Sequence, residues 1–339
     1  MRSVLPLLLL AGVACRPVET PAGPDTPTQA DAGTETSAGE PTATAEQTPP
    51  PQAPDVVEAN AVDGRPLLRP VLPDDVYADR HAKWLEAKAR YEAAPEDLDA
   101  IVWYGRRTAY LGRYQEAIDI FTAGLKIHLD EPHLLRHRGH RFITLRRFEQ
   151  AERDLDLAAS IVKTMPSEVE PDGLPNPAGI PTGTLQTNVY YHLGLALFLQ
   201  EKFDEALVAY RRCEAASTTD DMRVAVAYWL ALTFQRMGRN DEVPGLLKSF
   251  SADMPLLENH AYLQLLTLFK GEASAAQVLP GGTEGLDSAT LGFGVGHHHL
   301  AQGRLPVALE QWRAVVGTDQ WAAFGYIAAE VELHRRGTP

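Results

Sequence analysis

A short pattern recurs in this chain at an interval of 34 residues: LGRYQEAIDIF begins at Leu111, and LRRFEQAERDL begins at Leu145. Two later stretches, centred on Ala206 and Ala308, carry the same spaced residues. Each copy has a glycine twelve residues before its central alanine and a large residue four residues after it. A fixed period of this length predicts a stack of similar units, each of which buries its apolar surface against its neighbours.

The spacing of apolar residues within each copy predicts helices. They recur at intervals of three and four, as in Ile101, Tyr104, Thr108 and Leu111, which is the period of an amphipathic helix. Proline and glycine fall between such runs, and no stretch predicts a strand. The chain is therefore predicted to be all-α. A turn such as the one at Gly112 would join two antiparallel helices, because glycine suits a helix C-terminus.

Four positions agree in all four copies, and this pattern resembles the tetratricopeptide repeat family. They hold a glycine (Gly105, Gly139, Gly194, Gly296), an apolar residue at the turn (Tyr114, Phe148, Phe203, Leu305), an alanine (Ala117, Ala151, Ala206, Ala308) and a large residue (Phe121, Leu155, Tyr210, Trp312). The glycine and the alanine are expected where the two helices approach closely, and the large residue is expected to reach the next unit. The resemblance implies a right-handed α-solenoid of helix-turn-helix repeats with a C-terminal capping helix.

The resemblance also divides the chain into parts. Repeats are expected over residues 98–319, preceded by an N-terminal helical half-repeat at 66–97. Residues 320–339 would form the capping helix, with a polar outer face that ends the stack. Between the third and fourth clear copies, two degraded units fit the pattern, and they turn at Gly238 and Gly271.

Residues 1–15 have the features of an export signal: Arg2, then an apolar run, then small residues before Cys15. The apolar run is too short to span a membrane as a helix. Its end at a cysteine resembles the lipobox of bacterial lipoproteins, which implies a lipid-modified Cys15 and membrane attachment. Arg16 follows the cysteine, and in the sorting pattern of lipoproteins this implies an outer-membrane protein that faces the periplasm. Ordinary secretion without lipid is the alternative.

Residues 16–65 are rich in proline, threonine, alanine and acidic residues and contain no aromatic residue. Such a segment buries too little apolar surface to offset the entropy of ordering, so a disordered tether is predicted. It carries about half of the formal net charge of −14, so the acidity says little about the partners of the folded domain. For an exported protein with this net charge, nucleic acid is a poor partner. Besides Cys15 the chain has one cysteine, Cys213. An internal disulfide is therefore not expected, and Cys213 is predicted to be buried.

The resemblance implies a concave groove, lined by the first helices of successive units, that commonly binds peptides or partner proteins. By helical spacing its residues are Val102, Arg106, Tyr110, His133, Arg136, His140, Thr144, Asn188, Tyr191, Phe198 and Tyr228. One interpretation of Arg106, Arg136 and His140 is an anion-binding stripe aimed at carboxylates or phosphates, and the other is an ordinary solvated helix face. Arg138 falls where other copies have apolar core residues, so it predicts a carboxylate nearby.

The expected function is a non-catalytic scaffold of the cell envelope that binds a protein or peptide, without a cofactor. The alternative is an envelope enzyme or a metal-binding protein built on a helical solenoid. His133, His137 and His140 lie on adjoining sides of one predicted helix, and a second run spans His297–His299. However, no HExxH motif, nucleophile elbow or Walker loop is present.

An insert is predicted at about residues 162–186, because the alanines of the second and third copies are 55 residues apart. Its acids Glu168, Glu170 and Asp172 are opposite in charge to the basic helix before it. Either the insert docks on that helix, with apolar contacts from Leu174 and Ile180, or it is a mobile surface loop.

Overall fold

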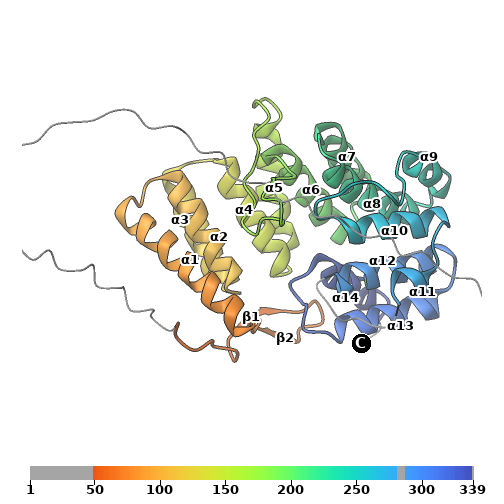
Figure 1. The fold of residues 1–339 in the computed structure, drawn as a ribbon, viewed down its shortest axis with the longest axis horizontal. Helices are drawn as coiled ribbons and strands as arrows, with labels where there is room; N and C mark the ends of the chain where they lie inside the picture. The colour runs from red at the N-terminus through yellow and green to blue at the C-terminus, as the bar shows by residue number, and fades with distance from the viewer. Residues whose placement is uncertain (1–48, 281–286, 338–339) are drawn as a thin grey trace, which may run out of the picture. The chain divides into compact units, whose positions relative to one another are not determined.

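The computed structural model describes residues 49–280 and 287–337, and most of this part of the chain is helical (Figure 1). The predicted signal, Cys15 and most of the predicted tether lie outside the described residues. The helices are α1 (Asp74–Ala93), α2 (Leu98–Tyr110), α3 (Tyr114–Ile127), α4 (Pro132–Thr144), α5 (Phe148–Val162), α6 (Leu185–Leu199), α7 (Phe203–Ala216), α8 (Asp220–Arg236), α9 (Val243–Leu247), α10 (His260–Lys270), α11 (Ala275–Val278), α12 (Ser288–Ala301), α13 (Leu305–Val316) and α14 (Phe324–Arg335).

Each clear copy of the pattern forms a pair of helices: α2 with α3, α4 with α5, α6 with α7, and α12 with α13. The fixed spacing between the glycine and the large residue of each copy has a steric cause. A Cβ atom on Gly139 would lie 2.7 Å from the Leu155 side chain, and one on Gly105 would lie 2.3 Å from Phe121. The four alanines are fully buried. The large residues also reach the next unit, since the Phe121 ring stacks on His137 at 5.7 Å. The predicted helical fold is confirmed.

The turns between paired helices need a left-handed residue. Gly112 and Gly303 supply it, with φ of +75° and +74°, and glycine adopts this conformation at little cost. In the second and third units the same place is held by Arg146 and Glu201, both with φ of +61°. Non-glycine residues seldom adopt a positive φ. Contacts elsewhere must therefore stabilise this backbone conformation at Arg146 and Glu201.

The two degraded units have short second helices. The long α8 is followed by α9, which has five residues, and α10 is followed by α11, which has four. Their turns contain Gly238 and Gly271, both with positive φ, as the repeat pattern predicts. Pro244 lies in the first turn of α9, and Val243 stands at the position where clear copies have alanine.

The prediction that the chain contains no strand is wrong. Strands β1 (Val57–Asn60) and β2 (Pro66–Leu68) form an antiparallel hairpin, so residues 57–65 are not part of a disordered tether. The hairpin is held by a buried carboxylate. Glu58 pairs with Arg69 at 2.6 Å, and it accepts a hydrogen bond from the Tyr114 backbone N–H at 3.0 Å. Glu58 thus caps α3, whose own N-cap residue forms no side-chain hydrogen bond.

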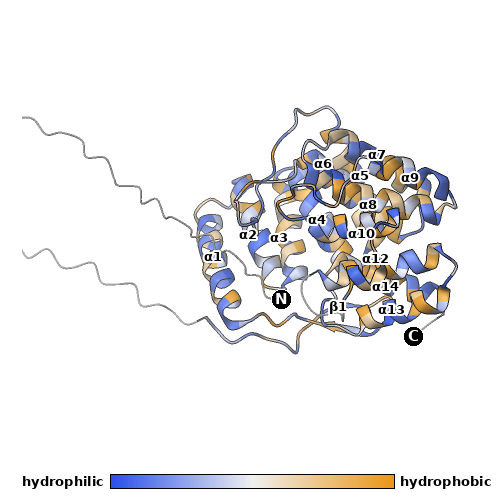
Figure 2. Ribbon diagram, turned by 45° about the vertical axis from the view of Figure 1, so that its right-hand side comes forward, coloured by the Kyte–Doolittle hydropathy of each residue, from blue (hydrophilic) through white to orange (hydrophobic). Residues whose placement is uncertain are grey.

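The C-terminal helix α14 ends the array, but the expected polar outer face is wrong. Nine of its twelve residues are buried, and Figure 2 shows hydrophobic residues gathered on α12 and α14. Besides packing on α12 and α13, this part of the chain reaches earlier units. The Phe324 ring lies 5.1 Å from the His140 ring on α4, and Arg335 donates a hydrogen bond to the Leu199 carbonyl at the end of α6. The last helix therefore packs against the first helices of the second and third units.

Two further features bear on function. Within residues 49–280 and 287–337, no helix combines the length and the apolar character needed to cross a membrane.

Cys213 on α7 is buried, as predicted, and its thiol lies 3.4 Å from the Thr187 carbonyl. Burial raises the pKa of this thiol to about 12, so it is not a reactive nucleophile in the folded protein.

Candidate functional site

Part of the predicted groove is filled by the chain itself. Besides Arg106, which is described below, five of the residues assigned to it are buried: Val102, Thr144, Tyr191, Phe198 and Tyr228. The Tyr191 hydroxyl lies 2.9 Å from the Tyr262 hydroxyl on α10 and accepts a hydrogen bond from Trp229. These five side chains are therefore not exposed on an open groove, and those of Tyr191 and Tyr228 pack against Tyr262 on α10.

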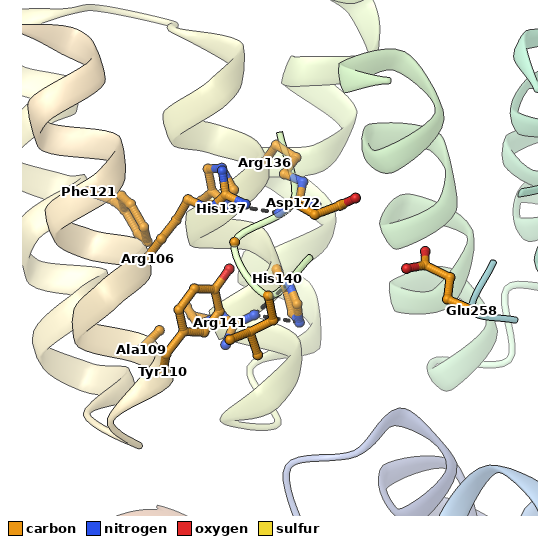
Figure 3. Close-up of a pocket in the computed structure, with 12 residues that line it drawn as sticks. Arg106, Ala109, Tyr110, Phe121, Arg136, His137, His140, Arg141, Asp172 and Glu258 are labelled. Atoms are coloured by element: carbon orange, nitrogen blue, oxygen red, sulfur yellow. Dashed lines mark hydrogen bonds between the residues drawn. The ribbon is translucent and has the colours of Figure 1, made fainter. Parts of the chain in front are cut away.

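The basic end of the predicted groove stays open. Arg106, Tyr110, Arg136 and His140 line one cavity of about 260 Å³, and their side chains reach it from α2 and α4 (Figure 3). The other two predicted residues lie nearby. His133 lines a second cavity of about 430 Å³, and Asn188 donates a hydrogen bond of 2.7 Å to the Glu170 carboxylate.

The insert lines both cavities. It runs from the end of α5 to the start of α6, and its residue Glu170 is only 5% exposed. One carboxylate oxygen of Glu170 lies 3.3 Å from Arg136 Nε, and the other lies 3.1 Å from His137 Nε2. Burial opposes ionisation of Glu170, but the charge of Arg136 and the hydrogen bond with His137 outweigh it, so the pKa of this carboxyl lies well below its usual range.

The insert is therefore docked, and two of its three acidic residues, Glu168 and Glu170, pair with α4. Glu168 lies 3.0 Å from His133 Nε2. The expected apolar contribution is wrong, because Leu174 and Ile180 are 52% and 53% exposed. Backbone contacts replace it: Arg106 donates a hydrogen bond of 2.7 Å to the Pro171 carbonyl, and the next residue on α2 binds the Gly173 carbonyl in the same way.

Arg106, Arg136 and Arg141 surround the first cavity, which we name the arginine pocket. Arg136 is neutralised by Glu170, but in the described part of the chain neither Arg106 nor Arg141 forms an ion pair with a carboxylate. Arg106 is 7% exposed, and its Nε is buried without a hydrogen-bond partner among the described residues. Burial lowers the pKa of Arg141 to about 10, so it is still charged at neutral pH.

Aromatic rings and histidines support these arginines. The guanidinium of Arg106 lies 4.4 Å from the centre of the Trp103 ring, and that of Arg141 lies 5.6 Å from the Tyr114 ring. Arg141 also contacts the His140 ring at 2.6 Å. Burial and the neighbouring Arg141 hold the pKa of His140 well below its usual value. This histidine is therefore neutral at pH 7 and adds no charge to the pocket.

Arg138 has the carboxylate that its position predicts. It donates hydrogen bonds of 2.7 Å and 2.8 Å to both oxygens of Asp154 on α5. His297 contacts Gln235 at 3.1 Å, and no group of three or more candidate ligands is arranged to hold a metal ion within the described ranges.

Comparison with known proteins bears on the repeat pattern. Residues 187–219, which cover most of α6 and all of α7, match the tetratricopeptide repeat family. The chain contains a tetratricopeptide repeat. The other helix pairs with the same glycine and alanine contacts make its fold a solenoid of tetratricopeptide-type units. Proteins with tetratricopeptide repeats are generally non-catalytic scaffolds for protein interaction.

Several solved tetratricopeptide repeat structures are similar to this chain. One is a tetratricopeptide repeat protein from Parabacteroides merdae, with 16% identity, coverage of 75% of this chain and 99% of that chain, and a TM-score of 0.44. Another is YrrB, described as having an unusual peptide-binding site, with 13% identity, coverage of 74% and 97%, and a TM-score of 0.38. No curated protein sequence gives a significant match.

The sequence analysis did not identify Arg141, which lines the arginine pocket, or Trp103, which packs against Arg106 and lines the second cavity. Arg141 follows the predicted groove residue His140 directly, and it was not assigned to the groove because the helical period favours spacings of three and four. Trp103 is likewise next to the predicted Val102. In both cases the sequence places the residue on a helix flank, and only the docked insert turns that flank into a pocket wall.

Proposed function

We propose that this protein is a non-catalytic scaffold of the cell envelope that binds a partner protein or peptide through the arginine pocket. The repeat fold supports binding as its general role. The pocket supports the location, since it lies in the part of the predicted groove that the chain's own residues leave open. A lipid at Cys15 would hold the scaffold on the outer membrane, facing the periplasm.

The observation that carries this proposal is the charge of the pocket. Arg106 is buried, Arg141 is partly buried, and neither forms an ion pair with a carboxylate among the described residues. Removing a charge from water is costly unless it is paired, so a chain that retains two such charges beside a cavity is suited to receive a negatively charged group. A negatively charged group on a partner would fill this role and would form charge-assisted hydrogen bonds.

A cross-linking and pull-down experiment from native membranes tests the proposal. The wild-type protein is expected to capture a defined partner, and the double variant Arg106→Gln/Arg141→Gln is expected to lose it. Arg211→Gln/Arg223→Gln is the matched control, because both of these arginines are about half exposed and lie outside the pocket. Equal capture by both double variants would show that the pocket is not the binding site.

The anchor needs a separate test. Cys15→Ser is expected to abolish fatty-acid labelling and to release the protein from the membrane fraction, because the lipid chains of Cys15 would supply the membrane affinity. Cys213→Ser is the control, since the Cys213 thiol is buried. Unchanged labelling in Cys15→Ser would rule out lipidation at this cysteine.

A further inference from the structure

We propose that the arginine pocket recognises a tetrahedral dianion of the phosphate type. This inference rests on the proposed function only in placing the binding site at the same pocket. It concerns the chemical group that the pocket takes, and that group can be tested without any partner protein.

The charge of the pocket favours a dianion. Glu170 already neutralises Arg136, with two oxygens shared among Arg136, His137 and Asn188. Arg106 and Arg141 are left as two positive charges without a carboxylate partner in the described chain. A single carboxylate would neutralise one of them, whereas a phosphate monoester, with a charge close to −2 at neutral pH, would neutralise both.

The directions of the donors also favour a tetrahedral group. Arg106 approaches from α2, and Arg136 and Arg141 approach from α4, with the Tyr110 hydroxyl on the same side as Arg106 (Figure 3). Donors that surround a cavity from two helices can each meet a different oxygen of a phosphate. A planar carboxylate offers two oxygens in one plane, which suits one guanidinium better than several.

The acidic residues at the pocket limit what can be attached to the anion. Asp172 lines the pocket, and its carboxylate points to the side on which Glu258 lies (Figure 3). Two carboxyl groups thus line this side of the pocket and would repel a second anionic group there. Burial, and next the neighbouring Glu258, raise the pKa of Asp172. The ligand is therefore one compact anionic group carried on a neutral or basic remainder, and a long acidic segment is disfavoured.

The insert gives the pocket a wall that a side chain would obstruct. A Cβ atom on Gly173 would lie 2.0 Å from the Tyr110 hydroxyl. Because position 173 is glycine, the insert backbone can lie directly against Tyr110 while its carbonyl accepts a hydrogen bond from Arg107 at 2.9 Å. This contact keeps the cavity narrow and suits a small group.

Isothermal titration calorimetry on the full chain tests the inference, at constant ionic strength, with inorganic phosphate, phenyl phosphate and acetate as probes. Phosphate and phenyl phosphate are expected to bind at one saturable site, and acetate is expected to bind at least about tenfold more weakly. Loss of one charged hydrogen-bonding group commonly weakens binding by about 10- to 100-fold. Arg141→Gln should show a loss of this size, and Arg211→Gln should bind as the wild type does.

Hydrogen exchange of the insert shows whether a variant weakens binding only because it releases the insert. If Arg106→Gln also frees the insert, its weaker binding has a structural cause. Arg141→Gln then decides, because in the described chain Arg141 forms no hydrogen bond with the insert backbone. Equal binding of acetate and phosphate, or wild-type phosphate binding by Arg141→Gln, would overturn the inference.

Two further probes identify the source of the phosphate group. Binding of vesicles that contain phosphatidic acid, abolished by Arg141→Gln and by competing phosphate, would assign a lipid headgroup. Binding of a phosphoserine peptide, but not of its unphosphorylated form, would assign a modified partner. The phosphate inference and the proposed scaffold function can be tested independently of each other. Capture of a partner without phosphate binding contradicts only this inference, and phosphate binding without a partner contradicts only the proposed scaffold function.

Discussion

Arg146, in the turn between α4 and α5, donates a hydrogen bond of 2.6 Å to the carboxylate of Glu330, which lies 184 residues later on α14. Both side chains are almost fully buried. Arg146 also binds the Trp321 carbonyl at 2.8 Å, and Glu330 accepts a hydrogen bond from the Val62 backbone N–H. One ion pair therefore joins the N-terminal hairpin, the second repeat and the last helix, and it holds Arg146 in its left-handed conformation.

We expect Glu330→Gln to lower the free energy of unfolding by about 3–5 kcal/mol, because removing one partner leaves the other charge buried and unpaired. Urea denaturation followed by circular dichroism measures this change. Glu214→Gln is the control: Glu214 pairs with Arg211 on the surface, and such pairs contribute about 0–1 kcal/mol. Similar midpoints for the two variants would contradict the structural role of Glu330.

We expect the amides of residues 168–185 to exchange slowly in the wild-type protein and to lose their protection in Glu170→Ala. Glu170 joins the insert to Arg136, His137 and Asn188, so its removal leaves these buried groups without their acceptor. Hydrogen exchange with mass spectrometry measures the effect. Leu174→Ser should leave the protection unchanged, since Leu174 is exposed. Loss of protection in Leu174→Ser would restore the apolar explanation of docking.

We expect Ala151→Leu to destabilise the protein by about 1–3 kcal/mol, because overpacking a closely packed core has a cost of this size. Ala151 is fully buried between α4 and α5. Glu149→Ala, two residues away on an exposed surface, should change the free energy of unfolding by about 0.5 kcal/mol at most. Coinciding thermal melts would mean that the register of the second unit is wrong.

We expect stability to fall as the pH is lowered from 7.5 to 5.5. Burial, together with Arg236, lowers the pKa of His297 to about 3, and burial with Arg136 does the same for His192. Below the ordinary histidine value of 6.5, the unfolded chain takes up protons that the folded chain refuses, so stability is lost between pH 6.5 and pH 3. The slope is about 1.4 kcal/mol per pH unit for each such histidine.

Thermal melts at several pH values measure this loss. His297→Gln should reduce the pH dependence, because glutamine does not titrate. His334→Gln should leave it unchanged, since His334 is exposed on the last turn of α14. A His297→Gln variant with the same pH dependence as the wild type would exclude His297 as a source of acid instability.

The charge relation between the insert and α4 was predictable in part. Glu170 and Arg136 have opposite charges, and the insert leads away from the helix pair that carries Arg136, so their pairing could be expected. The interactions that stabilise the docked insert could not be predicted. The sequence shows that Leu174 and Ile180 are apolar, but it does not show whether a loop turns them inward, which depends on where the backbone carbonyls of Pro171 and Gly173 find their donors.

The sequence by itself determined the helix pairs and their contacts within a unit. Gly139 meets Leu155 because their separation and the helical period bring them together whatever the rest of the chain does. Only the tertiary structure decided what the groove became. The contacts of Phe324 with His140 and of Glu330 with Arg146 join residues more than 180 positions apart, and no periodic pattern encodes such pairs. They depend on how small rotations between successive units accumulate, which brings α14 against α4 and α6 and leaves the arginine pocket open.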